Sequence, residues 1–382
     1  MIFNKGGHKF RTYHFFYKQN EIEIAQNYCY LGIEFTAAGN FNLALTRLKE
    51  KANKVLFSLR YFNSHGDIDM TFKLFQSLIV PIATYAGEVW APYLINSLNE
   101  DNFMQLCDRV PTEQVHVKLC RFLLGVHRKS SIAAVKGELG SYPLLITSLC
   151  SATKYWHQLH KCDPNSLIFH CLQDNYMQIE SKNTCWLTGI KKLMCKFDLN
   201  NYWENVRDTT IEPCVKTLSE KLCSEYTRLW AKFINGDGRD SNKLRTYCTF
   251  KNPNFRREKY LDLSIPIYKR KNFSKLRISA HDLQIEKGRY NKTPLERRLC
   301  NFCTHAVVED EVHFMLECEL YAAERQILLA SLEPHNINYL SVHEKFIFLM
   351  SGNNGDHFII KQVLRFVNSA MEVRQHRQSC RR

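Results

Sequence analysis

The sequence predicts a mainly α protein that has a small antiparallel β piece at its N-terminus and a compact cysteine- and histidine-rich module near its C-terminus. Three observations carry this prediction. β-favouring residues cluster only before residue 37, apolar residues recur at helical spacing over most of the remaining chain, and a C-x2-C-x9-H-x4-C motif occupies residues 300–318. At 382 residues, 45% of them hydrophobic, the chain is long enough for two or three globular domains.

Changes in composition and periodicity divide the chain into four successive segments. We expect short strands over residues 1–36, a helical bundle over 37–162, a helical connector over 163–250, and a basic module that contains the cysteine–histidine motif over 251–382. The polar break Lys18-Gln19-Asn20 separates two β-favouring runs and indicates a hairpin. So few strands cannot form a domain alone, because they bury too little surface.

Helical periodicity begins after residue 39. Asn40 is expected to cap a helix whose apolar stripe runs from Phe41 to Leu59. The next apolar helix runs from about residue 68 to 80, and Pro81 is expected to stop or kink it. Further helices are expected at 112–126, 131–139 (ended by Gly140), 143–160, 211–233 (before a break at 235–238), 320–331, 340–350 and 357–375, with a frayed basic tail over 374–382.

The C-x2-C-x9-H-x4-C motif has the ligands of a structural metal site: Cys300, Cys303, His313 and Cys318. Three thiolates and one imidazole suit Zn²⁺ better than a hard cation, and four protein ligands leave no open position for catalysis. We therefore expect a zinc-knuckle-like module held by structural Zn²⁺. His305 is a competing ligand of awkward position. The alternative is that a cysteine-rich chain produced the spacing by chance.

The formal net charge of +14 favours a polyanionic partner, most simply RNA or DNA. Residues 251–298 hold 14 lysines and arginines against five acids, with aromatic residues between them. This mixture is common where single strands are held, although a charged helix surface with buried aromatics is the alternative. We expect four arginines to contact phosphates, or else to form salt bridges to nearby glutamates: Arg277, Arg289, Arg297 and Arg298. Three lysines of the first predicted helix, Lys49, Lys51 and Lys54, either contact a nucleic-acid backbone or form a solvated helix face.

Catalytic patterns are weak in this sequence. His281 lies beside Asp282, and His116 lies in a helix, but neither has a nucleophile or second carboxylate at useful spacing, so both are interpreted as hydrogen-bonded structural histidines. The 15 cysteines are scattered, and no signal peptide or membrane span is evident. These features predict a reducing, intracellular location, in the nucleus or the cytoplasm, and no membrane partner.

Five motifs follow one another in a fixed order along the chain. The first pairs residues 1–7 (MIFNKGG) with Tyr30-Leu31-Gly32-Ile33, and the second joins Gly39-Asn40-Phe41 to Leu48-Lys49-Glu50-Lys51-Ala52. The remaining three are residues 78–90 (LIVPIATYAGEVW), residues 116–126 (HVKLCRFLLGV) with 137–144 (GELGSYPL), and residues 276–281 (LRISAH) with 285–290 (IEKGRY), which lead directly into the cysteine–histidine motif.

In this order and spacing the motifs resemble the carboxy-terminal portion of a non-LTR (LINE-like) retrotransposon reverse transcriptase, an RNA-directed DNA polymerase of a transposable element. The resemblance implies that residues 1–36 are residual strands of the palm edge, that 37–162 form a thumb-like bundle, and that 163–250 form the connector before the zinc module. It covers the chain from residue 1 to about 325.

The departure from the family pattern concerns catalysis. Such polymerases bind catalytic Mg²⁺ through palm aspartates that include an aromatic-x-Asp-Asp turn, and this sequence has no such turn; Asp67-Ile68-Asp69 and Asp237-Gly238-Arg239-Asp240 lack its strand context. We therefore expect a truncated fragment with no catalytic residues that is not an enzyme as it stands, binds RNA or DNA, and associates with an intact copy in trans. The alternatives are a zinc-stabilised protein-interaction scaffold and a non-functional pseudogene product.

Overall fold

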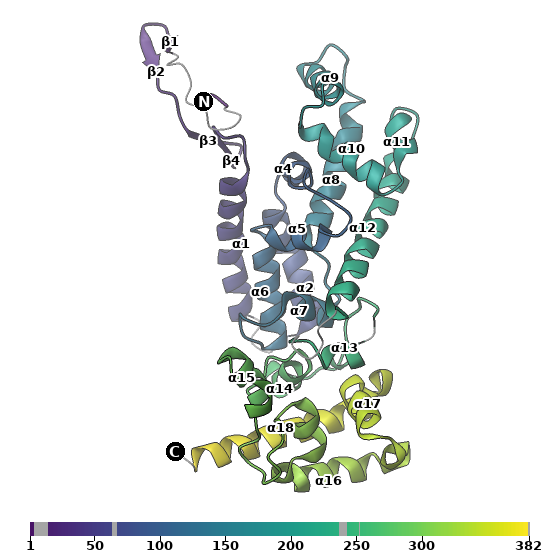
Figure 1. Ribbon diagram of the computed structural model, residues 1–382. Coiled ribbons are helices and arrows are strands. Elements are labelled where there is room, and N and C mark those ends of the chain that lie inside the picture. The colour runs from purple at the N-terminus through teal and green to yellow at the C-terminus, as the bar shows by residue number, and fades with distance from the viewer. Residues whose placement is uncertain (4–13, 63–66, 237–242, 252, 381–382) are drawn as a thin grey trace. The chain divides into compact units, whose positions relative to one another are not determined.

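The computed structural model describes residues 1–3, 14–62, 67–236, 243–251 and 253–380 (Figure 1). In these residues the chain is mainly α, and its strands are confined to two short hairpins before residue 37. The predicted fold class is therefore confirmed. Residues 4–7 of the first motif, residues 237–238 of the expected break, and the 237–240 aspartate pair lie outside the described residues.

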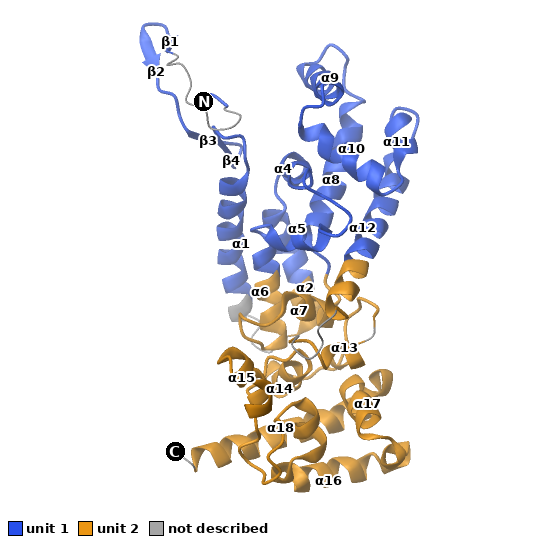
Figure 2. Ribbon diagram, in the orientation of Figure 1, with its two compact units in different colours: residues 1–59, 73–116, 142–226 blue, residues 60–72, 117–141, 227–382 orange. Residues whose placement is uncertain are grey.

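The chain divides into two compact units (Figure 2). Unit 1 comprises residues 1–59, 73–116 and 142–226, and unit 2 comprises residues 60–72, 117–141 and 227–382. Each unit thus gathers three separate stretches of chain, whereas composition suggested four successive segments. Composition changes along the chain do not reveal which helices pack together.

The β piece consists of two antiparallel two-stranded sheets, β1 (Phe15–Tyr17) with β2 (Asn20–Ile22) and β3 (Asn27–Tyr30) with β4 (Ile33–Thr36). The first hairpin turns where the polar break predicted it. The second turns at Leu31 and Gly32, which both have positive φ, as a two-residue turn that matches strand twist requires. Its strand β4 buries Ile33 against Ala44 and Leu48, which joins the β piece to the first helix.

Unit 1 is otherwise helical, and its helices approach closely at two glycines. A Cβ at Gly87 would lie 2.8 Å from the Ser148 side chain, and one at Gly189 would lie 2.2 Å from the Pro92 carbonyl oxygen. Helix α4 therefore packs directly on α8 and on α10. The helices that lie wholly or partly in unit 1 are α1 (Asn42–Phe62), α2 (Ile68–Leu74), η2 (Phe75–Ile79), α3 (Val80–Ala83), α4 (Gly87–Leu94), α5 (Phe103–Arg109), α6 (Glu113–Leu124), α8 (Leu144–Leu159), α9 (Leu167–Glu180), α10 (Trp186–Lys196), α11 (Asn200–Glu204) and α12 (Ile211–Ile234).

Several predicted helix ends agree with the structure. The Asn40 Oδ1 accepts from the Asn42 N–H, Ser131 caps α7 (Ile132–Leu139), and Gly140 ends α7 in the left-handed conformation. Of the two alternatives expected at Pro81, a stop or a kink, the stop does not occur. The carbonyl four residues before it belongs to Ser77 in the π-helical stretch η2, whose wider turn accommodates the ring, so the helix continues to Ala83.

Unit 2 contains α7, parts of α1, α2, α6 and α12, and residues 227–382. The expected frayed tail is wrong over its described part: α18 continues to Ser379, and Arg374 on it is buried. Its remaining elements are α13 (Tyr247–Phe250), η3 (Lys259–Leu261), α14 (Ile267–Arg277), α15 (Gln284–Tyr290), η4 (Leu295–Arg297), η5 (His313–Glu317), η6 (Glu319–Tyr321), α16 (Ala322–Ser331), η7 (Glu333–His335), η8 (Ile337–Tyr339), α17 (Val342–Gly355) and α18 (His357–Ser379).

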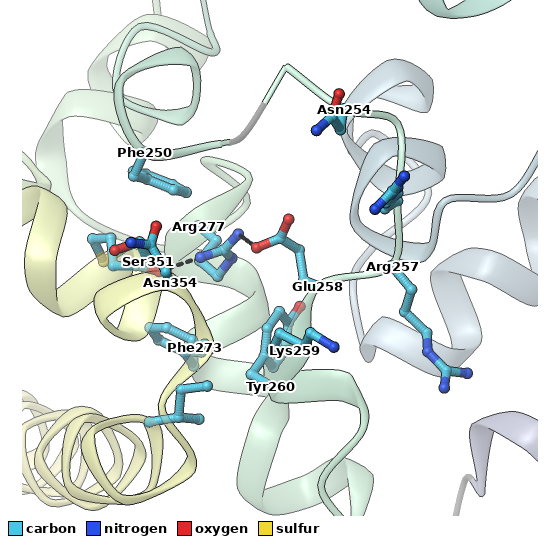
Figure 3. Close-up of a pocket in the computed structure, with 14 residues that line it drawn as sticks. Phe250, Asn254, Arg257, Glu258, Lys259, Tyr260, Phe273, Arg277, Ser351 and Asn354 are labelled. Carbon is cyan, nitrogen blue, oxygen red and sulfur yellow. Dashed lines mark hydrogen bonds and ion pairs between the residues drawn. The ribbon is translucent and has the colours of Figure 1, made fainter.

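A buried arginine joins four parts of unit 2. All three nitrogens of the Arg277 guanidinium donate: Nε to Glu138 Oε2 at 2.8 Å, NH2 to Glu138 Oε1 at 3.0 Å and to Glu258 Oε2 at 2.5 Å, and NH1 to the Met350 carbonyl. The Glu258 pair is drawn in Figure 3. Burial opposes the charge, but the two carboxylates outweigh it and raise the pKa of Arg277. The loop before η3 and the helices α7, α14 and α17 are thereby held at one point.

This arrangement corrects the expectation for Arg277. Its side chain is buried and lies over the rings of Phe250, Tyr260 and Phe273, with its carbon Cζ 4.7 Å from the Phe250 centroid. The neighbouring pocket is about 220 Å³, small for a ligand site. Arg277 therefore stabilises the fold from inside and does not present its guanidinium to a phosphate.

We expect Arg277→Met to lower the free energy of unfolding by about 3–5 kcal/mol, because it leaves the carboxylate of Glu138 buried without its arginine and leaves Glu258 with Lys251 alone. Lys269→Met, at an exposed position of the same helix, is the matched control and should change stability little. Urea denaturation followed by circular dichroism measures both. Equal effects of the two substitutions would contradict the assigned role.

Candidate metal centre

The four predicted ligands converge in a loop that is closed by backbone pairing. Leu299 forms an antiparallel bridge with Val308, and the Cys300 N–H donates to the Val307 carbonyl at 2.9 Å. The turn between them carries Cys303. The chain then enters the π-helical turn η5, whose wider ring lets the Cys318 N–H donate to the His313 carbonyl at 2.8 Å. Backbone geometry thus returns His313 and Cys318 to the two earlier thiols.

The ligand atoms of Cys300, Cys303, His313 and Cys318 all lie within 4.8 Å of one another. Cys300 Sγ is 3.8 Å from Cys318 Sγ, and Cys303 Sγ is 3.5 Å from His313 Nε2. Metal–sulfur bonds of about 2.3 Å and metal–nitrogen bonds of about 2.0 Å in a tetrahedron place the ligand atoms about 3.8 Å and 3.5 Å apart. The cluster therefore has the spacing to hold one tetrahedral metal ion.

The surroundings orient the ligands. Cys300, His313 and Cys318 are buried, and Cys303 is partly buried. His313 presents Nε2 to the cluster and its Nδ1 to Glu317 Oε2 at 3.4 Å, the kind of outer contact that fixes the tautomer of a metal-ligating imidazole. The competing ligand His305 does not take part: its side chain is 54% exposed, and its Nε2 lies 3.6 Å from Glu319.

Glu309 and Arg374 lie next to the four ligands and pair with each other. Glu309 Oε1 is 3.8 Å from Cys300 Sγ, and Arg374 of α18 donates from NH2 to Glu309 Oε2 at 3.0 Å and also pairs with Oε1. The Arg374 guanidinium also lies 4.7 Å from the Phe302 ring centroid. The Arg374 cation offsets the charge of the Glu309 carboxylate beside the Cys300 sulfur and attaches α18 to the metal loop.

A signal for Arg374 was present in the sequence. Phe366, Ala370 and Arg374 follow one another at four-residue spacing and are all buried, so Arg374 continues the apolar stripe of α18. A charged residue on such a stripe implies a buried partner of opposite charge. The prediction of a frayed tail did not take into account that the apolar stripe continues to Arg374.

Without metal, the cluster holds protons. The hydrogen bond with Cys318 and burial raise the pKa of Cys300 to about 12, and the pKa of Cys318 is lowered by the same hydrogen bond. Burial opposes the charge on His313, but the hydrogen bond with Cys300 and the nearby thiols outweigh it and raise its pKa to about 9. At pH 7 the metal-free cluster thus carries protons that a metal ion has to displace.

The other predicted basic site residues are divided between structural contacts and the surface. Arg289 pairs with Glu286 through Nε at 3.0 Å and NH2 at 2.9 Å, and its side chain is 39% exposed. Arg298 is half-buried and donates to the carbonyls of Thr293 and Ile285 at 2.9 Å each. Arg297 is exposed. On α1, Lys51 and Lys54 are exposed and Lys49 is half-buried.

The two histidines interpreted as structural are buried and hydrogen-bonded. His116 Nδ1 lies 2.7 Å from Glu113 Oε1, with its ring stacked on Phe75, and His281 Nε2 lies 2.9 Å from Glu311 Oε1. Burial opposes ionisation of Glu311, but His281 and Arg245 outweigh it and lower the pKa of Glu311 to about 2. These contacts resemble fold-stabilising pairs more than a catalytic arrangement.

Comparisons with protein-family models, with curated proteins and with solved structures found no match to this chain. Among the described residues, no helix combines the length and the apolar character that crossing a membrane requires. The resemblance stated from the motifs therefore rests on the residues of this chain alone.

Metal binding should release protons, because a metal ion displaces those held by His313 and Cys300. We expect the affinity for a divalent ion such as Co²⁺ to rise with pH from about 6 to about 9, the pKa of His313. Titration calorimetry in two buffers with different heats of ionisation counts the protons. Buffer-independent heats and a flat pH profile would contradict this description of the cluster.

We expect Arg374→Met to weaken metal affinity by about 10- to 100-fold, because Glu309 would then repel the bound thiolates without an adjacent cation. Arg365→Met, at an exposed position of the same helix, is the control. Competition against a chromophoric chelator measures both affinities. If the two variants bind metal equally well, Glu309 and Arg374 do not support the cluster.

Proposed function

We propose that this chain carries the zinc-stapled, nucleic-acid-binding region of a non-LTR retrotransposon reverse transcriptase, and that it binds RNA or DNA without polymerising it. The observation that carries the proposal is the convergence of Cys300, Cys303, His313 and Cys318 within a strongly basic module. Zinc is the metal that the donor set favours, since three thiolates and an imidazole at tetrahedral spacing suit it.

The role proposed for zinc is structural. Four protein ligands complete its coordination, so none of its positions is left for a substrate or a catalytic water. The ion would hold the loop from Cys300 to Cys318 against α18 through Glu309 and Arg374. Metal loading would in this way fix the surface on which the neighbouring arginines lie.

Charge supports a nucleic-acid partner. The chain carries 52 lysines and arginines against 38 acids, and the excess attracts a polyanion because bound phosphates release counterions. Arg289 and Arg297 present exposed guanidinium groups close in sequence to the metal loop. Polymerase chemistry is not part of the proposal, because the sequence has no aromatic-x-Asp-Asp turn, and Asp69 at the start of α2 pairs with Arg257.

The test uses the full chain with one equivalent of zinc, a fluorescein-labelled single strand, and anisotropy measured over a range of salt concentrations. Binding should weaken steeply with salt, and Arg289→Ala with Arg297→Ala should reduce the slope of log K against log salt by about 1.4, or about 0.7 for each lost phosphate contact. Arg365→Ala is the control.

Two outcomes would oppose the proposal. If the protein contains no zinc after purification in the presence of zinc, the proposed metal centre is contradicted. If the chain does not bind the labelled strand, or binds it independently of salt, the proposed nucleic-acid partner is contradicted. Partner capture that survives nuclease would favour the protein-interaction scaffold instead. For that alternative, unit 1 offers an apolar groove of about 430 Å³ lined by Tyr93, Tyr155, Leu167 and Ile168 among others.

A further inference from the structure

A second pocket of unit 2, with a volume of about 500 Å³, gathers basic side chains from separate parts of the sequence. It has the size of an ordinary ligand site. Its lining comes from the loop after α6, from the residue at the start of the 243–251 segment, from the loop between α14 and α15, and from α15 with the residue that follows it. The basic and aromatic residues that line it are His127, Lys129, Lys243, His281, Lys287, Arg289 and Tyr290.

The cations of this pocket outnumber its acids. Its two carboxylates are Asp282, which is exposed, and Glu286. Glu286 pairs with Arg289, and the NH1 of Arg245 lies 3.7 Å from its Oε1. The three lysines and one arginine of the lining therefore outnumber its two carboxylates. An arrangement of this kind is stabilised when an anion enters.

The pKa values of two groups in this pocket are lowered by burial and by neighbouring cations. Burial lowers the pKa of Lys243, and the nearby cations Arg289 and Arg121 lower it further, although Glu286 opposes the change. Burial likewise lowers the pKa of His127, and Lys243 and Lys275 add to that effect. Burial is thus the main cause of both shifts, and other cations lie close to each group.

Tyr290 supplies an aromatic surface at the edge of the same pocket. Its side chain is 65% exposed, and the Lys129 ammonium lies 4.1 Å from its ring centroid and bonds its hydroxyl. A ring of this kind can stack on a base of any sequence while adjacent cations contact the phosphate.

The wall that carries Arg289 and Tyr290 is attached to the metal loop. The Gln284 N–H donates to Glu309 Oε2 at 2.8 Å, the Ile285 N–H donates to the Glu309 carbonyl at 3.0 Å, and Arg298 NH1 donates to the Ile285 carbonyl at 2.9 Å. Glu309 therefore connects α15 both to Cys300 and to Arg374, so the pocket and the metal centre share their support.

We propose that this pocket binds one nucleotide unit, with its phosphate among Lys129, Lys243 and Arg289 and its base against Tyr290. The nucleotide belongs to a single strand of RNA or DNA, and this part of the inference rests on the proposed function. A free mononucleotide presents the same chemistry, so the experiment has one arm for each source.

The strand arm measures anisotropy of a fluorescein-labelled thymidine 20-mer with the zinc-loaded full chain. We expect Tyr290→Ala to weaken binding by about tenfold through loss of base stacking, and Tyr290→Phe to bind like the unaltered chain. Lys243→Ala should reduce the salt slope by about 0.7. Tyr339→Ala, which removes a tyrosine that is 88% exposed and does not line the pocket, is the matched control and should have no effect.

The second arm measures binding of thymidine 5′-monophosphate by calorimetry with the same variants. Mononucleotide binding that Tyr290→Ala and Lys243→Ala weaken supports the pocket even where the chain binds no strand, an outcome that overturns the proposed function alone. Strand binding that neither substitution changes, with thermal melts that show all variants folded, overturns the pocket and leaves the proposed function standing. Failure of the unaltered chain in both arms overturns both.

Discussion

The strongest constraint on unit 2 is the buried positive charge of the Arg277 guanidinium. Arg277 is buried, and a buried guanidinium is tolerated only where carboxylates and carbonyls take its hydrogens. Its partners come from residues 138, 258 and 350, so the requirement to satisfy one side chain fixes α7, the loop before η3 and α17 around α14. Lys251 extends the network, since its Nζ donates to Glu258 and to the Gly137 carbonyl. Removing Arg277 would leave the carboxylate of Glu138 buried without a cation beside it.

A second buried arginine applies the same rule to the metal loop. Arg374 lies at the end of the last helix, and its partner Glu309 lies nine residues after the first cysteine ligand. Glu309 also receives the backbone N–H groups that begin α15. The metal centre, the last helix and the wall of the basic pocket therefore depend on one carboxylate. This shared support gives a physical reason why a structural ion would influence a binding surface that it does not touch.

Local patterns were sufficient for the features that local chemistry decides. Ser131 and Gly140 define both ends of α7, and the spacing of Cys300, Cys303, His313 and Cys318 was enough to bring the four ligand atoms together, because short turns control their separation. The metal's identity remains a proposal. The sequence could not reveal that Glu138 faces Arg277 or that Glu309 faces Arg374, since those partners are separated by 139 and 65 residues. It also could not show that distant stretches alternate between the two units.

Charge counted along a sequence therefore overstates the charge that a partner can reach. Of the four arginines expected to contact phosphates, Arg277 is buried in the interior and Arg298 donates to backbone carbonyls, whereas Arg289 pairs with Glu286 and also lines the basic pocket. Lys129, Lys243 and Lys287 were not singled out from the sequence, yet they line a pocket whose cations exceed its acids. What distinguishes the two groups is compensation: a cation that faces a buried carboxylate holds the fold, whereas a cation that faces another cation gains from an incoming anion. The place where the chain would contact nucleic acid is thus better located by uncompensated charge than by the density of basic residues.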